Sequence, residues 1–123
     1  MSATHEPNFD WSQASSLLGE DPAQVEPDMI VIVLELIESS AVRFKELKAM
    51  NPATERAAIN SLAHQLRGSL LNFGFTAVGE VLWDIEKREY TPSEYPALVE
   101  KAQAAFDASK KMLGARYTSL RIS

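Results

Sequence analysis

The amino-acid sequence predicts an all-α protein, an antiparallel up-and-down four-helix bundle with a short additional helix near the N-terminus. Three observations lead to this fold class. Apolar residues recur every three or four positions through most of the chain, and no segment alternates apolar and polar residues convincingly as a strand would. Proline and glycine fall between the periodic segments, where helices begin and end. The connections between the long segments are short, which favours antiparallel neighbours.

The N-terminal part of the chain predicts one short helix and one long helix. The short helix runs from about Phe9 to Leu18 and ends at Gly19. Pro27 suits the first turn of the long helix, because its missing N–H costs nothing there. The β-branched run 30–33 resembles a strand, but the helical period continues for four turns beyond it. The expected buried stripe consists of Ile30, Leu34, Ile37, Ala41 and Phe44, widened by Val33 and Leu47.

Three more helices follow. Asn51 is the expected N-cap of the third helix, with Pro52 at its first position and Gly74 at its end. Thr76 is the expected cap of a fourth helix that runs to about residue 89. Ser93 is the expected cap of a fifth, with a proline in its first turn.

Composition limits the class of protein. The 123 residues suit a single domain, 1–123, in which the polar segment 1–8 forms a loose tail. A net charge of −5 gives no sign of a nucleic-acid-binding surface. The chain has no cysteine and only two histidines, His5 and His64, which excludes thiol chemistry and disfavours a histidine-rich metal site. There is no secretory signal and no apolar run long enough to cross a membrane, so we expect a cytoplasmic protein.

His64 stands beside the predicted buried face of the third helix and points partly outward. Gly68, one turn later, costs a helix about 1 kcal/mol relative to alanine, and its missing side chain would open space beside the imidazole. Arg67 can hold phosphate oxygens through its N–H donors. A lone histidine, glycine or arginine on a helix is ordinary, but this conjunction indicates a functional site. The surface neighbours of His64 at helical spacing are Asn60, Ser61, Arg67, Gly68 and Leu71.

The segment His64-Gln65-Leu66-Arg67-Gly68-Ser69, followed by Gly74, resembles the motif of histidine-containing phosphotransfer (HPt) domains. That motif reads His, any residue, Leu, Lys or Arg, Gly, Ser or Ala, with a second Gly ten residues after the His. The resemblance covers the central helical hairpin in detail and, elsewhere, only length and helix order. Three positions depart from it: Arg67 replaces the commoner Lys, and Leu70 and Phe75 stand where small residues are usual.

The resemblance implies a phosphorelay intermediate of two-component signal transduction, a phosphoprotein carrying phosphohistidine at His64. His64 would accept a phosphoryl group from a receiver-domain aspartate and pass it to another receiver aspartate. The expected partners are receiver domains of hybrid histidine kinases and response regulators, which supply Mg²⁺, so the chain itself needs no cofactor or metal. It would be a monomeric phosphocarrier rather than an enzyme. The expected docking residues are Asn60, Ser61, Gln65, Leu71 and Phe75, beside His64 and Arg67.

Glu86 is placed by geometry. If the chain reverses at Gly74, His64 lies ten residues before the turn and Glu86 twelve after it, at similar heights in an antiparallel hairpin. Some relatives have a Glu or Gln at this offset that accepts a hydrogen bond from the imidazole. Such a bond would fix the tautomer and leave the other ring nitrogen as nucleophile. The alternative is that Glu86 is a surface charge paired with a nearby Lys or Arg.

Two other functions stay open at this point. One is a helical interaction module, related to HPt domains or a general adaptor, that binds signalling partners without phosphotransfer. The other, an enzyme with its own active site, is disfavoured, because there is no metal-spaced carboxylate cluster, nucleophile motif or glycine-rich nucleotide loop.

Overall fold

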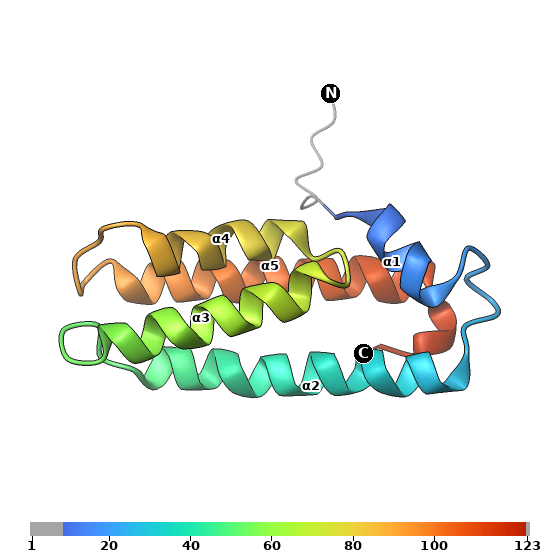
Figure 1. Cartoon of the computed structure of the whole chain (residues 1–123), viewed down its shortest axis with the longest axis horizontal. Coiled ribbons are helices and arrows are strands. Elements are labelled where there is room, and N and C mark those ends of the chain that lie inside the picture. The colour runs from blue at the N-terminus through green and yellow to red at the C-terminus, as the bar shows by residue number, and fades with distance from the viewer. Residues whose placement is uncertain (1–8, 123) are drawn as a thin grey trace, which may run out of the picture.

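The computed structural model describes residues 9–122, a range that contains five α-helices, one 3₁₀ helix and no strand (Figure 1). The all-α class is therefore confirmed. The predicted loose tail, 1–8, lies outside the described residues. The helices are α1 (Trp11–Leu18), α2 (Pro27–Ala49), α3 (Arg56–Leu71), α4 (Thr76–Lys87), α5 (Tyr95–Arg116) and the 3₁₀ helix η1 (Thr118–Leu120).

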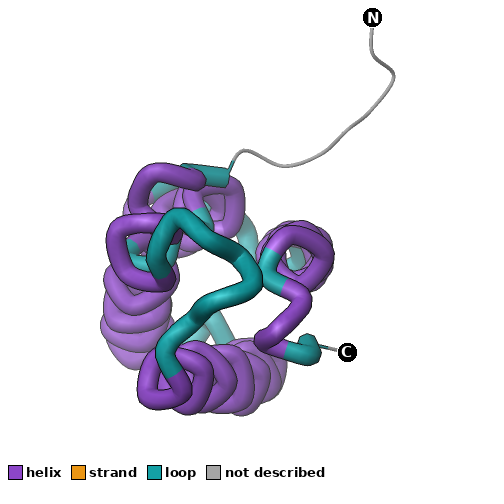
Figure 2. Tube along the Cα trace, turned by 90° about the vertical axis from the view of Figure 1, so that its right-hand side faces the viewer, coloured by secondary structure: helices purple, strands orange, loops and turns teal. Residues whose placement is uncertain are grey.

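The four long helices lie side by side along the length of the molecule (Figure 1). Each contacts two of the others: α3 packs against α2 and α4, and α5 packs against α4 and α2. Seen end-on, helices lie on every side of a common centre (Figure 2). Phe106 of α5 is fully buried, with its ring centroid 5.3 Å from Phe44 of α2 and 5.9 Å from Phe75.

The buried face of α2 agrees with most of the predicted stripe. Val33, Ser40, Phe44 and Leu47 are buried, whereas Leu34 is 39% exposed. The prediction is therefore right at Val33, Phe44 and Leu47, and Ile30 and Ile37 pack partly buried against the core. It is wrong at Leu34. Because this segment is apolar on several sides, its period shows a helix without fixing which side faces the core.

Two helices begin later than predicted. Asp10 accepts a hydrogen bond from the Gln13 amide, so it is the N-cap and α1 starts at Trp11 rather than Phe9. Asn51 does not cap α3. Its side chain accepts from the Ala53 amide, and its own N–H donates to the Glu55 carboxylate. These bonds close a separate turn, and the helix starts one turn later, at Arg56.

The predicted caps of α4 and α5 are also displaced. Thr76 is the first residue of α4 rather than its cap, and no side-chain bond caps that helix. Glu94, not Ser93, directly precedes α5, and its carboxylate accepts from the Thr91 amide in the preceding turn.

The hairpin of α3 and α4 is held at both ends. Gly74 has φ +93° in the turn, and a Cβ there would collide with the carbonyl oxygen of Asp10. The Asp10 amide donates to the Gly74 carbonyl at 2.8 Å, which ties the turn to the residue that caps α1. At the other end, Arg56 donates to the carbonyls of Ile85 and Arg88, at 3.3 and 2.8 Å. These contacts fix the register between the two helices.

Candidate functional site

His64 projects into solvent from the middle of α3. Its neighbours Ala63 and Leu66 are fully buried, while the imidazole is 63% exposed. Its Nδ1 faces α4. Among the described residues, its Nε2 takes part in no hydrogen bond. The helix therefore offers one ring nitrogen to the protein and the other to solvent.

Glu86 of α4 holds the inner side of the ring. Its Oε2 lies 3.1 Å and its Oε1 3.3 Å from Nδ1 of His64, at the height that the hairpin geometry predicted. An ionised carboxylate can only accept a hydrogen bond, so Nδ1 carries the proton and donates it. In the neutral ring Nε2 then keeps its lone pair. This arrangement can support a nucleophilic nitrogen directed at solvent.

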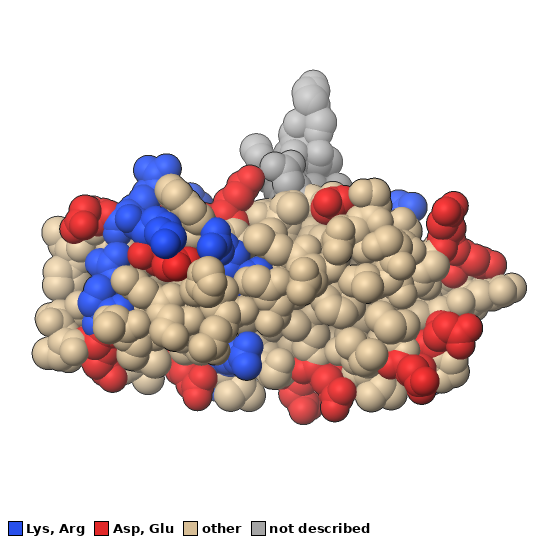
Figure 3. Space-filling view, viewed as in Figure 1, with Lys and Arg blue, Asp and Glu red and all other residues tan. Residues whose placement is uncertain are grey.

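Two cations surround the same carboxylate. Nη2 of Arg67 lies 3.4 Å from Oε1 of Glu86, and Nζ of Lys87 lies 3.3 Å from Oε2. Nη2 of Arg67 is also 3.4 Å from Nδ1 of His64. Both of these nitrogens carry protons, so they form a contact and not a hydrogen bond. The Glu86 carboxylate accepts a hydrogen bond from Nδ1 of His64 and forms an ion pair with Arg67. Figure 3 shows basic side chains gathered over this part of α3 and α4.

The charge state of Glu86 follows from its surroundings. Its side chain is only 10% exposed. Burial raises the pKa of the carboxyl, but hydrogen bonds from Lys87 and His64, together with their positive charges, outweigh burial and lower the pKa below its usual value. Glu86 is therefore ionised at neutral pH. Glu86 was predicted either to accept a hydrogen bond from the imidazole or to pair with a nearby Lys or Arg. Both kinds of contact are present, since Glu86 contacts the imidazole and two cations.

Lys87 was missed by sequence reasoning. The signal was its position next to Glu86 at the end of α4, but adjacent helical residues normally point in different directions. A long, half-exposed side chain allows Lys87 to fold back onto its neighbour.

The predicted docking residues divide into three groups. Ser61 and Gln65 are exposed, and Leu71 is 37% exposed. Asn60 is half-buried and accepts a hydrogen bond from Nε of Arg56. Phe75 is fully buried, so its assignment to the docking surface is wrong. The tight turn at Gly74 directs the next side chain into the core, where its ring lies 5.3 Å from Phe9.

Gly68 lies on open surface. A Cβ built at this position would meet no atom within 4 Å, and its φ is not positive. Packing and backbone conformation therefore both allow a side chain here. Nothing within the described part of the chain requires glycine.

The described residues show no cluster of three or more His, Asp or Glu side chains placed to hold a metal ion. No described helix is both long and apolar enough to cross a membrane.

The fold and the site together define an all-helical protein with a solvent-facing histidine that a carboxylate of the next helix braces. The family model of the Hpt domain matches residues 31–114, which is more than half of the chain. The chain therefore belongs to the Hpt domain family. Hpt domains act in histidine phosphotransfer of two-component signalling, as phosphocarriers rather than catalysts, and interact with receiver domains. No curated protein and no solved structure matches the chain.

Proposed function

We propose that this protein is a phosphorelay intermediate in which His64 takes a phosphoryl group from a receiver-domain aspartate and gives it to another. The observation that carries the proposal is the orientation of the imidazole. Nδ1 lies 3.1 Å from the Glu86 carboxylate, and the ring is 63% exposed. The free nitrogen, Nε2, is the nucleophile.

In the first step, the Nε2 lone pair attacks the phosphorus of the receiver's aspartyl phosphate. The N–P bond forms as the P–O bond to the aspartate breaks, and the carboxylate leaves with the bonding electrons. The Nδ1 proton stays on the ring, hydrogen-bonded to Glu86, so the carboxylate stabilises the positive charge that develops there. Onward transfer is the reverse reaction with a second receiver, and the electron pair of the N–P bond returns to Nε2.

The cations provide the charge compensation. Phosphoryl transfer depends mainly on positioning and on neutralising the charge spread over the phosphoryl oxygens. Arg67 is 22% exposed beside the ring and can direct its N–H donors to those oxygens. The remaining catalytic groups, with Mg²⁺, belong to the receiver. The protein needs no cofactor of its own for this role.

The arrangement of the helices supports the same proposal. The long helices form an antiparallel up-and-down bundle, to which α1 is the additional helix, and α3 and α4 form the hairpin that carries the reacting residues. A single domain, a monomeric state and a cytoplasmic location stay predictions.

The test is transfer of radioactive label from a purified receiver domain phosphorylated on its aspartate. The wild-type protein should gain label that is lost in acid and kept in alkali, as expected for a phosphoramidate. His64→Gln should gain none, and the matched variant His5→Gln, which replaces the other histidine of the sequence, should label normally. Label on His64→Gln, or none on the wild type with any receiver that binds it, would contradict phosphotransfer. The second result favours the module that binds without transfer.

A further inference from the structure

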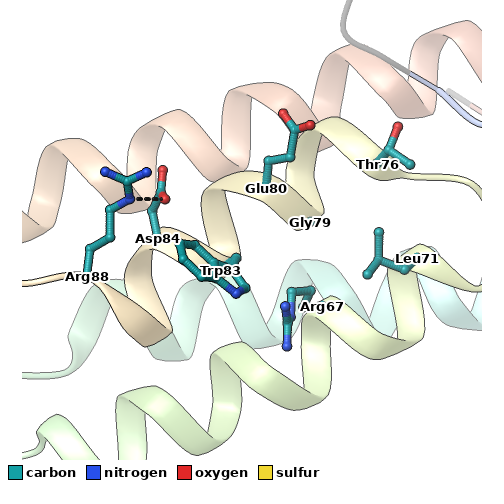
Figure 4. Close-up of a pocket in the computed structure, with 8 residues that line it drawn as sticks. All are labelled: Arg67, Leu71, Thr76, Gly79, Glu80, Trp83, Asp84 and Arg88. Carbon is teal, nitrogen blue, oxygen red and sulfur yellow. Dashed lines mark hydrogen bonds and ion pairs between the residues drawn. The ribbon is translucent and has the colours of Figure 1, made fainter.

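A hollow of about 580 Å³ lies between α3 and α4 on the side of Arg67 (Figure 4). Arg67, Leu71 and Trp83 lie on its α3 side, where Trp83 points from α4 toward α3. Thr76 and Glu80 line it on the other side and point away from α3. Of the residues assigned to the His64 site, Arg67 also lines this hollow.

The hollow has an apolar wall. Trp83 is 41% exposed and Leu71 is 37% exposed. Leu71 lies over Gly79 so closely that a Cβ on that glycine would be 2.6 Å from a Leu71 methyl carbon. Among the described residues, Leu71 and Trp83 are the exposed large apolar side chains of α3 and α4, and both line this hollow. Exposed apolar side chains gathered in a concave site are suited to contact with an apolar group of a partner.

The hollow is continuous with the proposed phosphotransfer site. Arg67 lines it and also contacts Glu86. Leu71 is seven residues from His64, about 10 Å along the helix, and Trp83 is three residues from Glu86, about 4.5 Å. A protein that docks stably covers about 800 Å² on its partner, which corresponds to a patch of about 16 Å radius. A receiver centred on His64 therefore covers the hollow.

The charges around the hollow limit what can enter. Asp84 is paired with Arg88 at 2.7 Å, and Arg67 is paired with Glu86. Glu80 is exposed and has no ion-pair partner among the described residues. It lies one helical turn from Trp83. The unpaired charge at the rim is therefore acidic, and a basic group beside an apolar one complements it.

We propose that this hollow determines which receiver domains dock on the protein. The occupant is a surface segment of the receiver that places an apolar side chain against Trp83 and Leu71, with a Lys or Arg next to it that reaches Glu80. The inference rests on the proposed function, since it takes the receiver as the partner. It extends the docking surface from α3 onto α4.

The first measurement uses Trp83 as its own reporter. In a Trp11→Phe background it is the only tryptophan of the chain. The probe is a panel of purified receiver domains that contain no tryptophan. A receiver that docks in the hollow should shift Trp83 emission to shorter wavelength and protect it from iodide quenching.

The second measurement uses variants in the transfer assay. Trp83→Ala should raise the receiver concentration for half-maximal transfer at least about 30-fold, as expected for a central aromatic contact. Glu80→Lys should raise it severalfold, and more at low salt than at high salt, because a rim charge acts on association. Val42→Ala removes an apolar side chain that is 54% exposed on α2 and should change neither value. Circular dichroism checks that each variant is folded.

The outcomes separate the two proposals. If a receiver labels His64 while Trp83 emission and iodide quenching stay unchanged, the hollow is not a docking site and phosphotransfer stands. If a receiver protects Trp83 without ever labelling His64, the docking surface stands and phosphotransfer is wrong. If folded Trp83→Ala and Glu80→Lys accept label at wild-type receiver concentrations, the hollow does not select the partner. If no receiver binds or labels the protein, both proposals are overturned.

Discussion

Replacing Gly68 by alanine should stabilise the protein and slow phosphotransfer at the same time. Glycine in a helix is less favourable than alanine by about 0.5–1 kcal/mol. The added Cβ meets nothing within 4 Å, so no clash subtracts from this gain. Spread over an unfolding entropy of about 2.1 cal/mol/K for each residue of this chain, that gain raises the melting temperature by about 2–4 °C.

The loss of transfer has a separate cause. Gly68 lies one turn after His64 on the same face, so the new methyl group occupies space that an approaching receiver would fill. Adding a methyl group to a packed contact costs about 1–3 kcal/mol, which corresponds to a transfer rate reduced about 5- to 150-fold. Rapid-quench measurement of label transfer, at receiver concentrations below saturation, gives that rate directly. Thermal unfolding of the same preparation gives the stability.

Gly114→Ala is the matched control. It places the same substitution in α5, where the Cβ lies 3.1 Å from Cβ of Ile122, and it should leave label transfer unchanged. A Gly68→Ala variant that transfers label at the wild-type rate would show that the open surface is not needed by the partner. A variant that melts below the wild type would show that the glycine has a structural role.

Three further variants test the site and the packing around it. Glu86→Gln keeps an acceptor for the imidazole but loses its charge, so transfer should slow about tenfold. Because the pKa of Glu86 is lowered in the folded protein, the carboxylate stabilises the fold at neutral pH, and this stabilisation is lost as pH falls through that pKa. Acid unfolding of the variant should therefore show a smaller loss of stability. Burial raises the pKa of Tyr95, so stability should fall above pH ~10 by up to about 1.4 kcal/mol per pH unit, and urea titrations of Tyr95→Phe should lack this fall. At pH 7 the same variant should lose about 1–2 kcal/mol, because the Leu47 carbonyl loses its donor. Arg56→Met removes two bonds to the end of α4 and should cost about 1–3 kcal/mol in chemical unfolding and slow transfer by displacing Glu86; unchanged values would show that the register is set elsewhere.

Helical period and helix rise predict some features better than others. The pairing of His64 with Glu86 needs only two helices and a known turn, so it could be placed by counting residues from Gly74. The start of α3 could not be predicted in this way, because Asn51 can cap either a helix or an isolated turn, and Glu55 decides between them. The prediction that Phe75 lies on the docking surface was wrong for a related reason, because the side chain after a tight turn takes its direction from that turn.

The hollow between α3 and α4 was out of reach of sequence reasoning. Trp83 and Leu71 come from different helices, and each is an ordinary residue in its own segment. Only the contact of Leu71 with Gly79 brings them to one surface. Sites of this kind depend on packing between helices, which the period of a single helix does not record.

The hydrogen bond from the Asp10 amide to the Gly74 carbonyl joins a residue outside the family match, which begins at residue 31, to a residue inside it. The segment that carries α1 therefore serves as a brace on the hairpin. Detachment of α1 would release one end of the α3–α4 pair and uncover Phe75 from Phe9. The exchange rate of the Asp10 amide hydrogen would report that event. A molecule that binds this segment would therefore act, through the Asp10–Gly74 hydrogen bond, on the helices that bear His64 and Glu86.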